Sequence, residues 1–249
     1  MISSHLWNNV PTKFGTSFHS CQDGGVPPRS RRTDALTRER IVAAAIEILD
    51  ADGPDALTFR ALATSLSTGS GAIYHHVAGK DELLAAATDA VLGPILAAPG
   101  GTGGTGDAPR ETIRALALTL FDTIDAHPWL AAQVMADPGR PANLLLSERI
   151  GGAVLAMGTP EAALFDAATA IVGYVLGAAA QNAANARSDL ARSGPSREEL
   201  LGAVAGRIEL LDRDQFPYLH RIAATMAHHD DRAQFLAGLD LLLTGVAAL

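Results

Sequence analysis

The sequence has few of the residues that define several protein classes. Among its 249 residues there is a single cysteine, Cys21, so an intrachain disulfide and a cysteine-based zinc site are both excluded, and a reducing compartment fits best. Aromatic residues make up only 5% of the chain. The first ten residues lack the positive charge and the apolar run of a secretory signal, so we expect a cytoplasmic protein.

The chain also lacks a long hydrophobic run. Its most apolar stretch, Ala167–Ala180, has 14 residues, whereas a membrane-crossing helix needs about 18 or more. We therefore expect no membrane partner and interpret this stretch as a buried helix.

Negative charge dominates the chain but is unevenly distributed. The net charge is −8, and an apolar content of 48% with only 18% charged residues excludes a disordered chain and a simple nucleic-acid-coating protein. Residues 1–80 carry a net charge of +1 and the remaining residues −9, with arginines clustered between Arg29 and Arg40. Only the N-terminal region is therefore suited to approach a polyanion.

Segments rich in glycine and proline divide the chain. Residues 1–32 have no apolar periodicity and are expected to form a disordered tail with a basic end. Residues 33–80 are expected to form one helical domain and residues 81–249 a larger one, with the sequence PGGTGGTGDAP at 99–109 as a flexible connector. Apolar residues recur at helical spacing and no alternating strand pattern appears, so we predict an all-α fold.

In the first domain, Thr37 is expected to cap one helix, Gly53 to end it, and Thr58 to cap a second. Leu62, Leu66 and Ile73 would seat the second and third helices on the first through Ile41, Ile48 and Leu49. Further helices are predicted over Asp81–Ala98 with a weak point at Gly93-Pro94, Arg110–Ala126, Pro128–Met135, Pro141–Met157, Pro160–Ala186, Arg197–Arg213, Pro217–His228 and Arg232–Ala248.

The most informative segment is 37–84. It contains Leu57-Thr58-Phe59-Arg60-Ala61-Leu62-Ala63, then Ile73-Tyr74-His75-His76-Val77, then Lys80-Asp81-Glu82-Leu83-Leu84. In one register, this stretch resembles the DNA-binding domain of the tetracycline-repressor-like (TetR) family, with its pattern L-T-x-R-x-L-A, Y-x-H-F/V and K-x-x-L-L. The resemblance implies a three-helix helix-turn-helix domain that binds double-stranded DNA.

Two sets of residues are predicted to contact DNA. The resemblance implies backbone or groove contacts for Thr58, Arg60, Tyr74, His76 and Lys80, whose hydroxyl and charged groups suit phosphates. A short helix held at a fixed angle fits the major groove, and its exposed positions would be Ser70, Gly71, Ala72 and His75.

The turn before the third helix differs from the family pattern. Where the family has Gly-Val-Ser, this chain has Ser67-Thr68-Gly69, so a serine occupies the position of positive φ and a glycine caps the third helix. An alternative interpretation of Tyr74, His75 and His76 is a buried aromatic cluster or a metal site, but the surrounding register favours contact with DNA.

The C-terminal half also resembles that family, in the branch with a tetracycline-repressor-type regulatory domain. The resemblance implies a homodimer formed by two helices near the C-terminus, for which Ala167–Ala180 and Arg232–Ala248 are the candidates. Dimerisation would place two recognition helices about 34–36 Å apart and imply a palindromic operator.

The regulatory domain is expected to hold a largely apolar small-molecule effector between its helices. The predicted effector contacts are Phe121, Trp129, Met135, Leu145, Tyr174 and Asn182, although core packing is an alternative for each of them.

No motif indicates catalysis, a cofactor or a metal. The chain has no G-x-S-x-G elbow, and GTGGTG at 101–106 fits no phosphate-binding loop. His228-His229-Asp230-Asp231 is interpreted as a helix junction in which an aspartate caps the last helix. The sequence therefore predicts a ligand-responsive transcriptional repressor, with a helical enzyme or a protein-binding scaffold as the alternatives.

Overall fold

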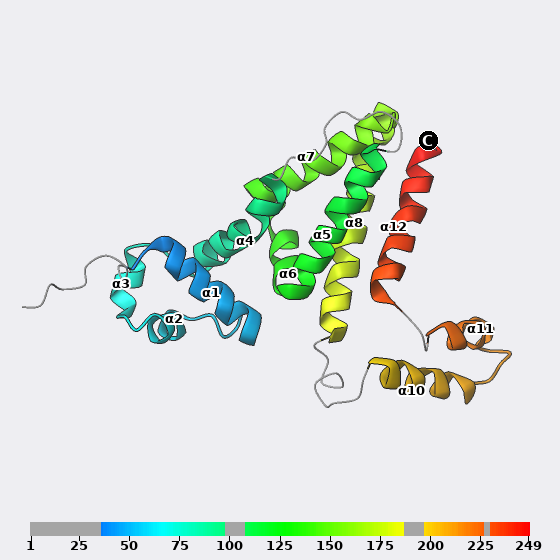
Figure 1. Ribbon diagram of the computed structural model, residues 1–249, viewed down its shortest axis with the longest axis horizontal. Coiled ribbons are helices and arrows are strands. Elements are labelled where there is room, and N and C mark those ends of the chain that lie inside the picture. The colour runs from blue at the N-terminus through cyan, green and yellow to red at the C-terminus, as the bar shows by residue number, and fades with distance from the viewer. Residues whose placement is uncertain (1–35, 98–107, 187–196, 227–229) are drawn as a thin grey trace, which may run out of the picture. The chain divides into compact units, whose positions relative to one another are not determined.

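The computed structural model describes residues 36–97, 108–186, 197–226 and 230–249, and within these ranges it contains eleven helices and no strand (Figure 1). The all-α prediction is confirmed. The predicted tail at 1–32 lies outside the described residues, as does most of the 99–109 connector.

Helices α1 to α3 form an N-terminal unit that we call the head, and α4 leads from it into the remaining helices, which we call the body (Figure 1). The helices are α1 (Arg38–Asp52), α2 (Phe59–Ser65), α3 (Ser70–Tyr74), α4 (Lys80–Ala97), α5 (Ala108–Ala126), α6 (Leu130–Ala136), α7 (Pro141–Ala156), α8 (Glu161–Ala186), α10 (Arg197–Glu209), α11 (Pro217–Met226) and α12 (Asp231–Ala247).

The ends of the head helices follow from local chemistry, as predicted. The Thr37 hydroxyl oxygen accepts a hydrogen bond from the Arg40 amide at 3.3 Å, and the Thr58 hydroxyl oxygen accepts one from the Ala61 amide at 3.1 Å. Each bond satisfies an amide that has no partner inside the helix. Helix α1 ends at Gly53, whose φ of 80° favours glycine.

The turn between α2 and α3 has the predicted backbone. Ser67 has a φ of 51° and is the one non-glycine residue with positive φ in the described part of the chain. Gly69 caps α3 without a side-chain hydrogen bond, and the Thr68 amide donates to the Ala63 carbonyl at 2.9 Å. Leu62 and Ile73 are fully buried and Leu66 is partly buried, and α2 packs on both α1 and α3.

Helix α4 contacts both the head and the body. It packs on α1 at one end and on α6 and α7 further along. It continues through Pro94 to Ala97. The Arg149 guanidinium of α7 donates to the carbonyls of Ile95 and Leu96 at 3.0 and 3.1 Å, which gives the last turn of α4 a cationic partner.

The core of the body lies where α5, α7 and α12 pack on α8 (Figure 1). Apolar side chains that are almost fully buried fill this core, among them Ile113, Leu120, Ile124, Ile171, Val175, Leu239 and Leu243. An ion pair between Arg114 and Asp240 joins α5 to α12, and Arg110 approaches the same carboxylate at 3.5 Å. Arg114 lowers the pKa of Asp240, with Arg110 adding to the effect.

Two predictions about the body helices need correction. The segment 167–180 lies within α8, in agreement with the helix predicted over Pro160–Ala186, but residues Glu161–Asn185 of that helix are long and apolar enough to cross a membrane, a test of length and composition that core helices also pass. It is not fully buried, because one face packs on α5, α7 and α12 and the other is exposed. The helix predicted to reach Arg213 ends at Glu209, where the Asp212 carboxylate accepts hydrogen bonds from the next turn's amides.

Candidate functional sites

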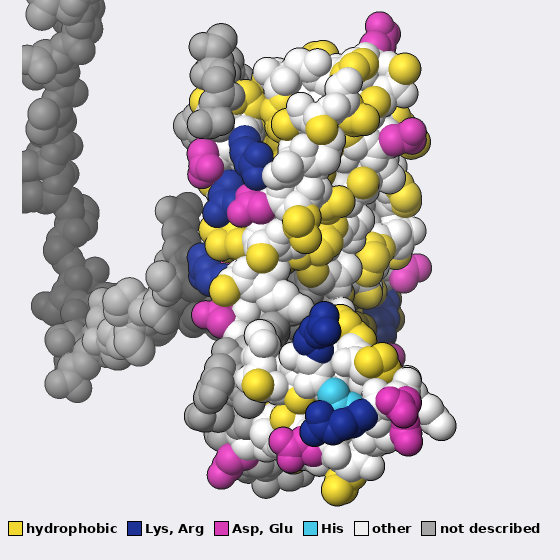
Figure 2. All heavy atoms as spheres, turned by 90° about the vertical axis from the view of Figure 1, so that its right-hand side faces the viewer, with side chains coloured by type: hydrophobic (Ala, Val, Ile, Leu, Met, Phe, Trp, Pro, Cys, Tyr) yellow, Lys and Arg dark blue, Asp and Glu magenta, His cyan; other side chains and the backbone are white. Residues whose placement is uncertain are grey.

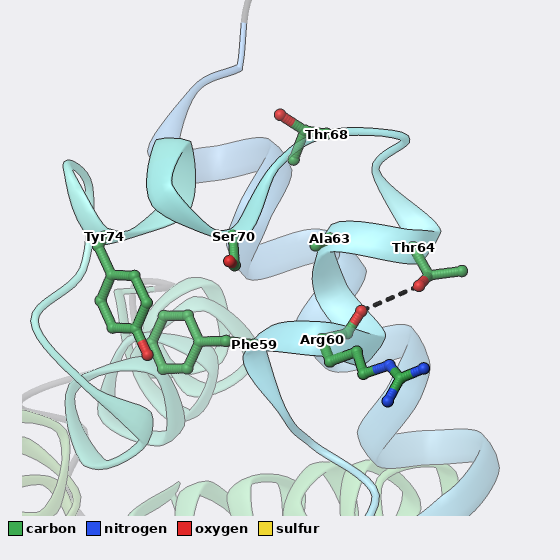
Figure 3. Close-up of a pocket in the computed structure, with 7 residues that line it drawn as sticks. All are labelled: Phe59, Arg60, Ala63, Thr64, Thr68, Ser70 and Tyr74. Carbon is green, nitrogen blue, oxygen red and sulfur yellow. Dashed lines mark hydrogen bonds between the residues drawn. The ribbon is translucent and has the colours of Figure 1, made fainter.

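The exposed side of the head combines a basic, a hydroxyl and an aromatic group. Arg60 of α2 and Ser70 of α3 are exposed, and together with Thr64, Thr68 and Tyr74 they border a hollow of about 460 Å³ (Figure 3). Figure 3 shows α2 and α3 on opposite sides of this hollow. The surface offers a cation and several hydrogen-bonding groups, which suits a phosphate backbone.

Tyr74 is exposed by 56%, yet its ring is held in place. It stacks on the ring of Phe59 with centroids 4.2 Å apart and planes within 8° of parallel (Figure 3). Phe59 begins α2 and Tyr74 ends α3, so the stack joins the two helices of the motif. A tyrosine fixed in this way presents its hydroxyl with little loss of side-chain freedom on binding. Phe59 was not identified by the sequence reasoning, because its position in the motif carries no fixed residue type.

Helix α3 exposes small side chains toward solvent. Ser70, Gly71 and His75 are exposed, Ala72 and His76 are half-buried, and Ile73 is buried against the head core. Of the predicted groove-facing positions, Ser70, Gly71 and His75 are therefore accessible and Ala72 is partly so. The interpretation of residues 74–76 as a buried aromatic cluster does not fit this arrangement.

Lys80 lies at the start of α4 and makes a bond within the head. Its Nζ atom donates to the Pro54 carbonyl at 2.6 Å, in the turn between α1 and α2. Nearby, the Glu82 carboxylate accepts from the Ala78 amide at 2.7 Å and pairs with Arg38 at 3.0 Å. These two partners, the amide first, lower the pKa of Glu82. The exposed Lys80 thus helps to hold the head together at the edge of the candidate DNA surface.

The body contains a groove of about 700 Å³ beside α8 and α12. Three of the six predicted effector contacts line it, namely Phe121, Tyr174 and Asn182. Its remaining walls come from α8, α10, α11 and α12, through Ala178, Gln181, Asn185, Leu201, Ile222, Met226, Asp231, Gln234, Phe235, Ala237, Gly238 and Leu241. The volume lies in the range of sites that hold drug-sized ligands.

Aromatic rings form an apolar wall of this groove. Phe121 and Phe235 lie with centroids 4.6 Å apart, and Tyr174 stacks on Phe235 at 5.7 Å. The Tyr174 hydroxyl donates to the Phe235 carbonyl at 2.9 Å, and burial raises the pKa of Tyr174. Gly238 makes room for this hydroxyl, since a Cβ atom there would overlap it.

The other three predicted effector contacts lie elsewhere. Met135 lines a second, smaller cavity of about 250 Å³ between α6, α7 and α8. Leu145 is exposed and lines neither cavity. Trp129 is 3% exposed and also lines neither cavity, because its indole N–H donates to the Asp50 carboxylate at 2.7 Å.

Asp50 makes a polar bridge between the head and the body. The oxygen that accepts from Trp129 also lies 2.8 Å from Nδ1 of His127. Asp50 is near the end of α1, whereas the two rings belong to the connection between α5 and α6. Sequence reasoning did not identify this bridge, and no local signal could have shown it, because 77 and 79 positions separate its members.

One face of the body carries large apolar side chains that the chain itself leaves uncovered. Figure 2 looks onto the side that carries α12 and shows hydrophobic side chains gathered there. Phe165 of α8 and Leu241 of α12 are exposed by 79% and 77%. Gly173 and Gly177 are also exposed on α8, and residues without a bulky side chain let another helix approach closely.

Within the described ranges, no group of three or more histidine, cysteine or acidic side chains is placed to hold a metal ion. The predicted role of Asp230 is confirmed, because its carboxylate accepts from the Ala233 amide at 2.9 Å and caps α12. His228 and His229 lie outside the described residues.

Two family models match this chain, one over the head and the start of α4 and the other over the body. A family model described as bacterial regulatory proteins, tetR family, matches residues 41–87, and one described as tetracyclin repressor-like, C-terminal domain, matches residues 103–249. An HTH-type transcriptional regulator of Saccharopolyspora erythraea is 33% identical, covering 84% of this chain and 86% of its own. The HTH-type transcriptional repressor DrrR1 of Streptomyces coeruleorubidus is 30% identical, covering 91% and 83%.

Solved structures are similar over most of the chain. The transcriptional regulator SCO7222, a TetR from Streptomyces coelicolor, is 46% identical with a TM-score of 0.73 and covers 86% of this chain and 99% of its own. ActR from the same organism, in complex with actinorhodin, is 27% identical with a TM-score of 0.70, covering 86% and 96%. BioQ with its double-stranded DNA operator is 28% identical with a TM-score of 0.56, covering 86% and 100%.

Proposed function

Because the chain belongs to the TetR family of bacterial regulatory proteins, we propose that it is a ligand-responsive transcriptional repressor that binds a palindromic operator as a homodimer. A small-molecule effector releases it from DNA. The protein acts in the cytoplasm and catalyses no reaction. Its two domains are residues 33–80, which bind DNA, and residues 81–249, which bind the effector and the second copy.

The observation that carries this proposal is the exposed surface of α2 and α3. Arg60, Ser70 and the stacked Tyr74 lie together on it, on helices seated by buried leucine and isoleucine side chains (Figure 3). Phosphate contacts from such groups fix the position of a protein on DNA, while a helix in the major groove reads the bases. BioQ, a structural relative, binds a double-stranded DNA operator.

Dimerisation occurs through α8 and α12. The exposed Phe165 and Leu241 and the small residues beside them would be buried by the same face of a second copy (Figure 2). With twofold symmetry, the two α3 helices would lie in successive major grooves on one side of the DNA.

Release by an effector requires a path from the body to the head. Helix α4 supplies one contact, since it packs on α1 as well as on α6 and α7, and Asp50 supplies another through Trp129. An effector that prefers one arrangement of these contacts changes the separation of the two heads. Coupling of this kind is typically about 1–3 kcal/mol.

Fluorescence anisotropy with labelled DNA from the region flanking the coding sequence tests DNA binding. We expect affinity to fall steeply with salt, and to fall at least tenfold in Tyr74→Ala and Arg60→Ala. Tyr218→Ala and Arg221→Ala change the same residue types on the exposed side of α11 and should leave affinity unchanged. Equal affinity of all four variants, with circular dichroism intact, would refute the assigned surface.

The oligomeric state is tested separately by analytical ultracentrifugation. The wild-type chain should sediment as a dimer, and Leu241→Glu should shift it toward a monomer, because a charge cannot be buried unpaired in the interface. Leu210→Glu, at an exposed leucine after α10, is the matched control. A wild-type monomer at micromolar concentration would contradict the dimer.

A further inference from the structure

The smaller cavity, between α6, α7 and α8, is lined by a residue with a polar atom that has no partner. Asn143 of α7 is 6% exposed and lines the cavity, and its amide oxygen accepts no hydrogen bond within the described part of the chain. A buried acceptor without a donor is unfavourable, because it loses its water on folding and gains no bond in return. The Asn143 oxygen is therefore an atom to which a bound molecule can donate a hydrogen bond.

The orientation of the Asn143 amide follows from its other contacts. Its nitrogen donates to the carbonyls of Val134 and Asp137 at 2.6 and 2.5 Å, at the C-terminal end of α6. The opposite orientation would place the amide oxygen against two carbonyl oxygens, none of which can donate. Both N–H groups of the amide are thus used, and Asn143 offers an acceptor and no further donor.

The walls of the smaller cavity are mostly apolar. Val134, Leu146 and Leu176 are buried beside it, whereas the hydroxyl-bearing residues Ser147 and Thr169 are exposed. The cavity has a volume of about 250 Å³. An engineered apolar cavity of about 150 Å³ holds benzene, so this volume suits a molecule of one or two rings.

Exposed residues border the cavity on two sides. Met135 and Pro138 lie at the end of α6, and Thr169 and Gly173 lie on α8. The two α8 positions continue the four-residue spacing that starts at Phe165, so the cavity lies beside the face proposed to contact a second copy. The unbranched Met135 side chain can move aside, which provides an entry on the α6 side.

We propose that this smaller cavity is a second ligand site, which binds a small, largely apolar molecule that carries one hydrogen-bond donor, such as a phenol. The ring packs against the leucine and valine side chains, and the hydroxyl donates to the Asn143 oxygen. Among the described residues, the cavity shares no lining residue with the groove of about 700 Å³ beside α8 and α12. Binding here therefore goes beyond the proposed function and requires no DNA.

A matched pair of probes tests the need for a donor. Phenol and toluene have nearly the same shape, but toluene carries a methyl group in place of the hydroxyl. Their dissociation constants for the full chain are measured by ligand-observed NMR titration. We expect phenol to bind at least about threefold more tightly, although toluene is the more apolar molecule, because only phenol pairs with the buried oxygen. Tighter binding of toluene, equal affinities, or no binding of either probe would overturn the proposal.

Two glycines of α8 locate the bound probe. Gly173 lines the smaller cavity, whereas Gly177, one turn further along the same helix, lines neither this cavity nor the groove. A Cβ atom at either position meets no other atom within 4 Å, so both tolerate a side chain. Gly173→Leu should occupy the cavity and weaken phenol binding at least about tenfold, because the ring loses its space. Gly177→Leu is the control and should bind phenol as the wild type does. Equal affinity of the two variants would place the probe elsewhere and refute the site.

Removal of the acceptor tests the role of Asn143. Asn143→Ala should abolish the preference for phenol over toluene while toluene still binds, since the apolar walls remain. Asn182→Ala removes an amide from the other cavity and should leave the preference unchanged. An unchanged preference in Asn143→Ala would show that its oxygen is not the acceptor. Because Asn143→Ala also removes two hydrogen bonds to α6, circular dichroism monitors its fold, and the glycine pair decides the outcome if it unfolds.

Discussion

The contacts that shape the head join residues close together in the sequence, whereas those that shape the body join residues far apart in the sequence. In the head, Thr37 and Thr58 each cap a helix through an amide three residues away, and Gly53 ends α1 by its own φ. In the body, the Tyr174 hydroxyl bonds a carbonyl 61 positions away, and 126 positions separate Arg114 from Asp240. A contiguous motif can therefore describe the DNA surface, whereas no contiguous motif describes the groove.

The two regions meet at Asp50 and along α4, so their stabilities are related but need not be equal. Short helices that depend on caps and a few buried leucines open more readily than long helices packed on a common core. Variants that change one region, the contact between the two regions, or a single surface pair test this difference in stability.

The largest effect is expected from matched core deletions. Leu62→Ala in the head and Leu239→Ala in the body each remove a fully buried side chain, at a cost of about 2–5 kcal/mol. Hydrogen exchange should show faster exchange in α1 to α3 for the first variant and in α5, α8 and α12 for the second. Identical exchange patterns would mean that head and body open as one unit.

The next effect concerns the contact between the regions. Asp50→Ala leaves the buried indole N–H of Trp129 without its acceptor, and we expect a loss of about 1–3 kcal/mol in denaturant unfolding. Asp52→Ala, at an exposed position of the same helix, should cost far less. If the two variants unfold alike, the bridge contributes nothing to stability.

A smaller effect is expected at the stacked pair on the DNA surface. Phe59→Leu removes the ring under Tyr74, and a stack of this kind contributes about 0.5–1.5 kcal/mol, so operator affinity should fall about two- to tenfold. Phe59→Tyr keeps the stack and should bind almost as well as the wild type. Anisotropy titrations of the two variants would contradict the role of Phe59 if both lost affinity equally.

The smallest effect is a pH dependence in the body. Because Arg114 holds the pKa of Asp240 below its ordinary value of 3.8, the carboxylate stabilises the fold above that value and the contribution is lost as the pH falls through the lowered pKa. The pair is partly solvent-exposed, so we expect less than about 1 kcal/mol. Urea unfolding between pH 2 and 6 should show a shallower acid dependence for Asp240→Asn than for the wild type.

Much of the head could be predicted, because its determinants lie close together in the chain. The positive φ of Ser67 and the capping by Gly69 were both expected from the turn sequence. The same reasoning missed Phe59, since only the packing of α2 against α3 brings its ring under Tyr74.

In the body, the sequence identifies several aromatic residues near the effector groove but not the residues that they contact. Phe121 and Tyr174 were expected near an effector and line the same groove, but Phe235, which joins their rings, was not singled out. Trp129 is predicted to contact the effector as well. Its indole lies instead at the bridge to the head, because the fold places Asp50 within 2.7 Å of it.

The amino-acid sequence alone predicts that the chain is helical, where the head helices start and stop, and which segment resembles a DNA-binding motif, because caps, turns and apolar spacing act over a few residues. Which aromatic residues share a groove, and which one joins the head to the body, depends instead on contacts between segments that are far apart in the chain. Those outcomes depend on how α5, α8 and α12 pack, and contacts between distant segments are set by the whole core.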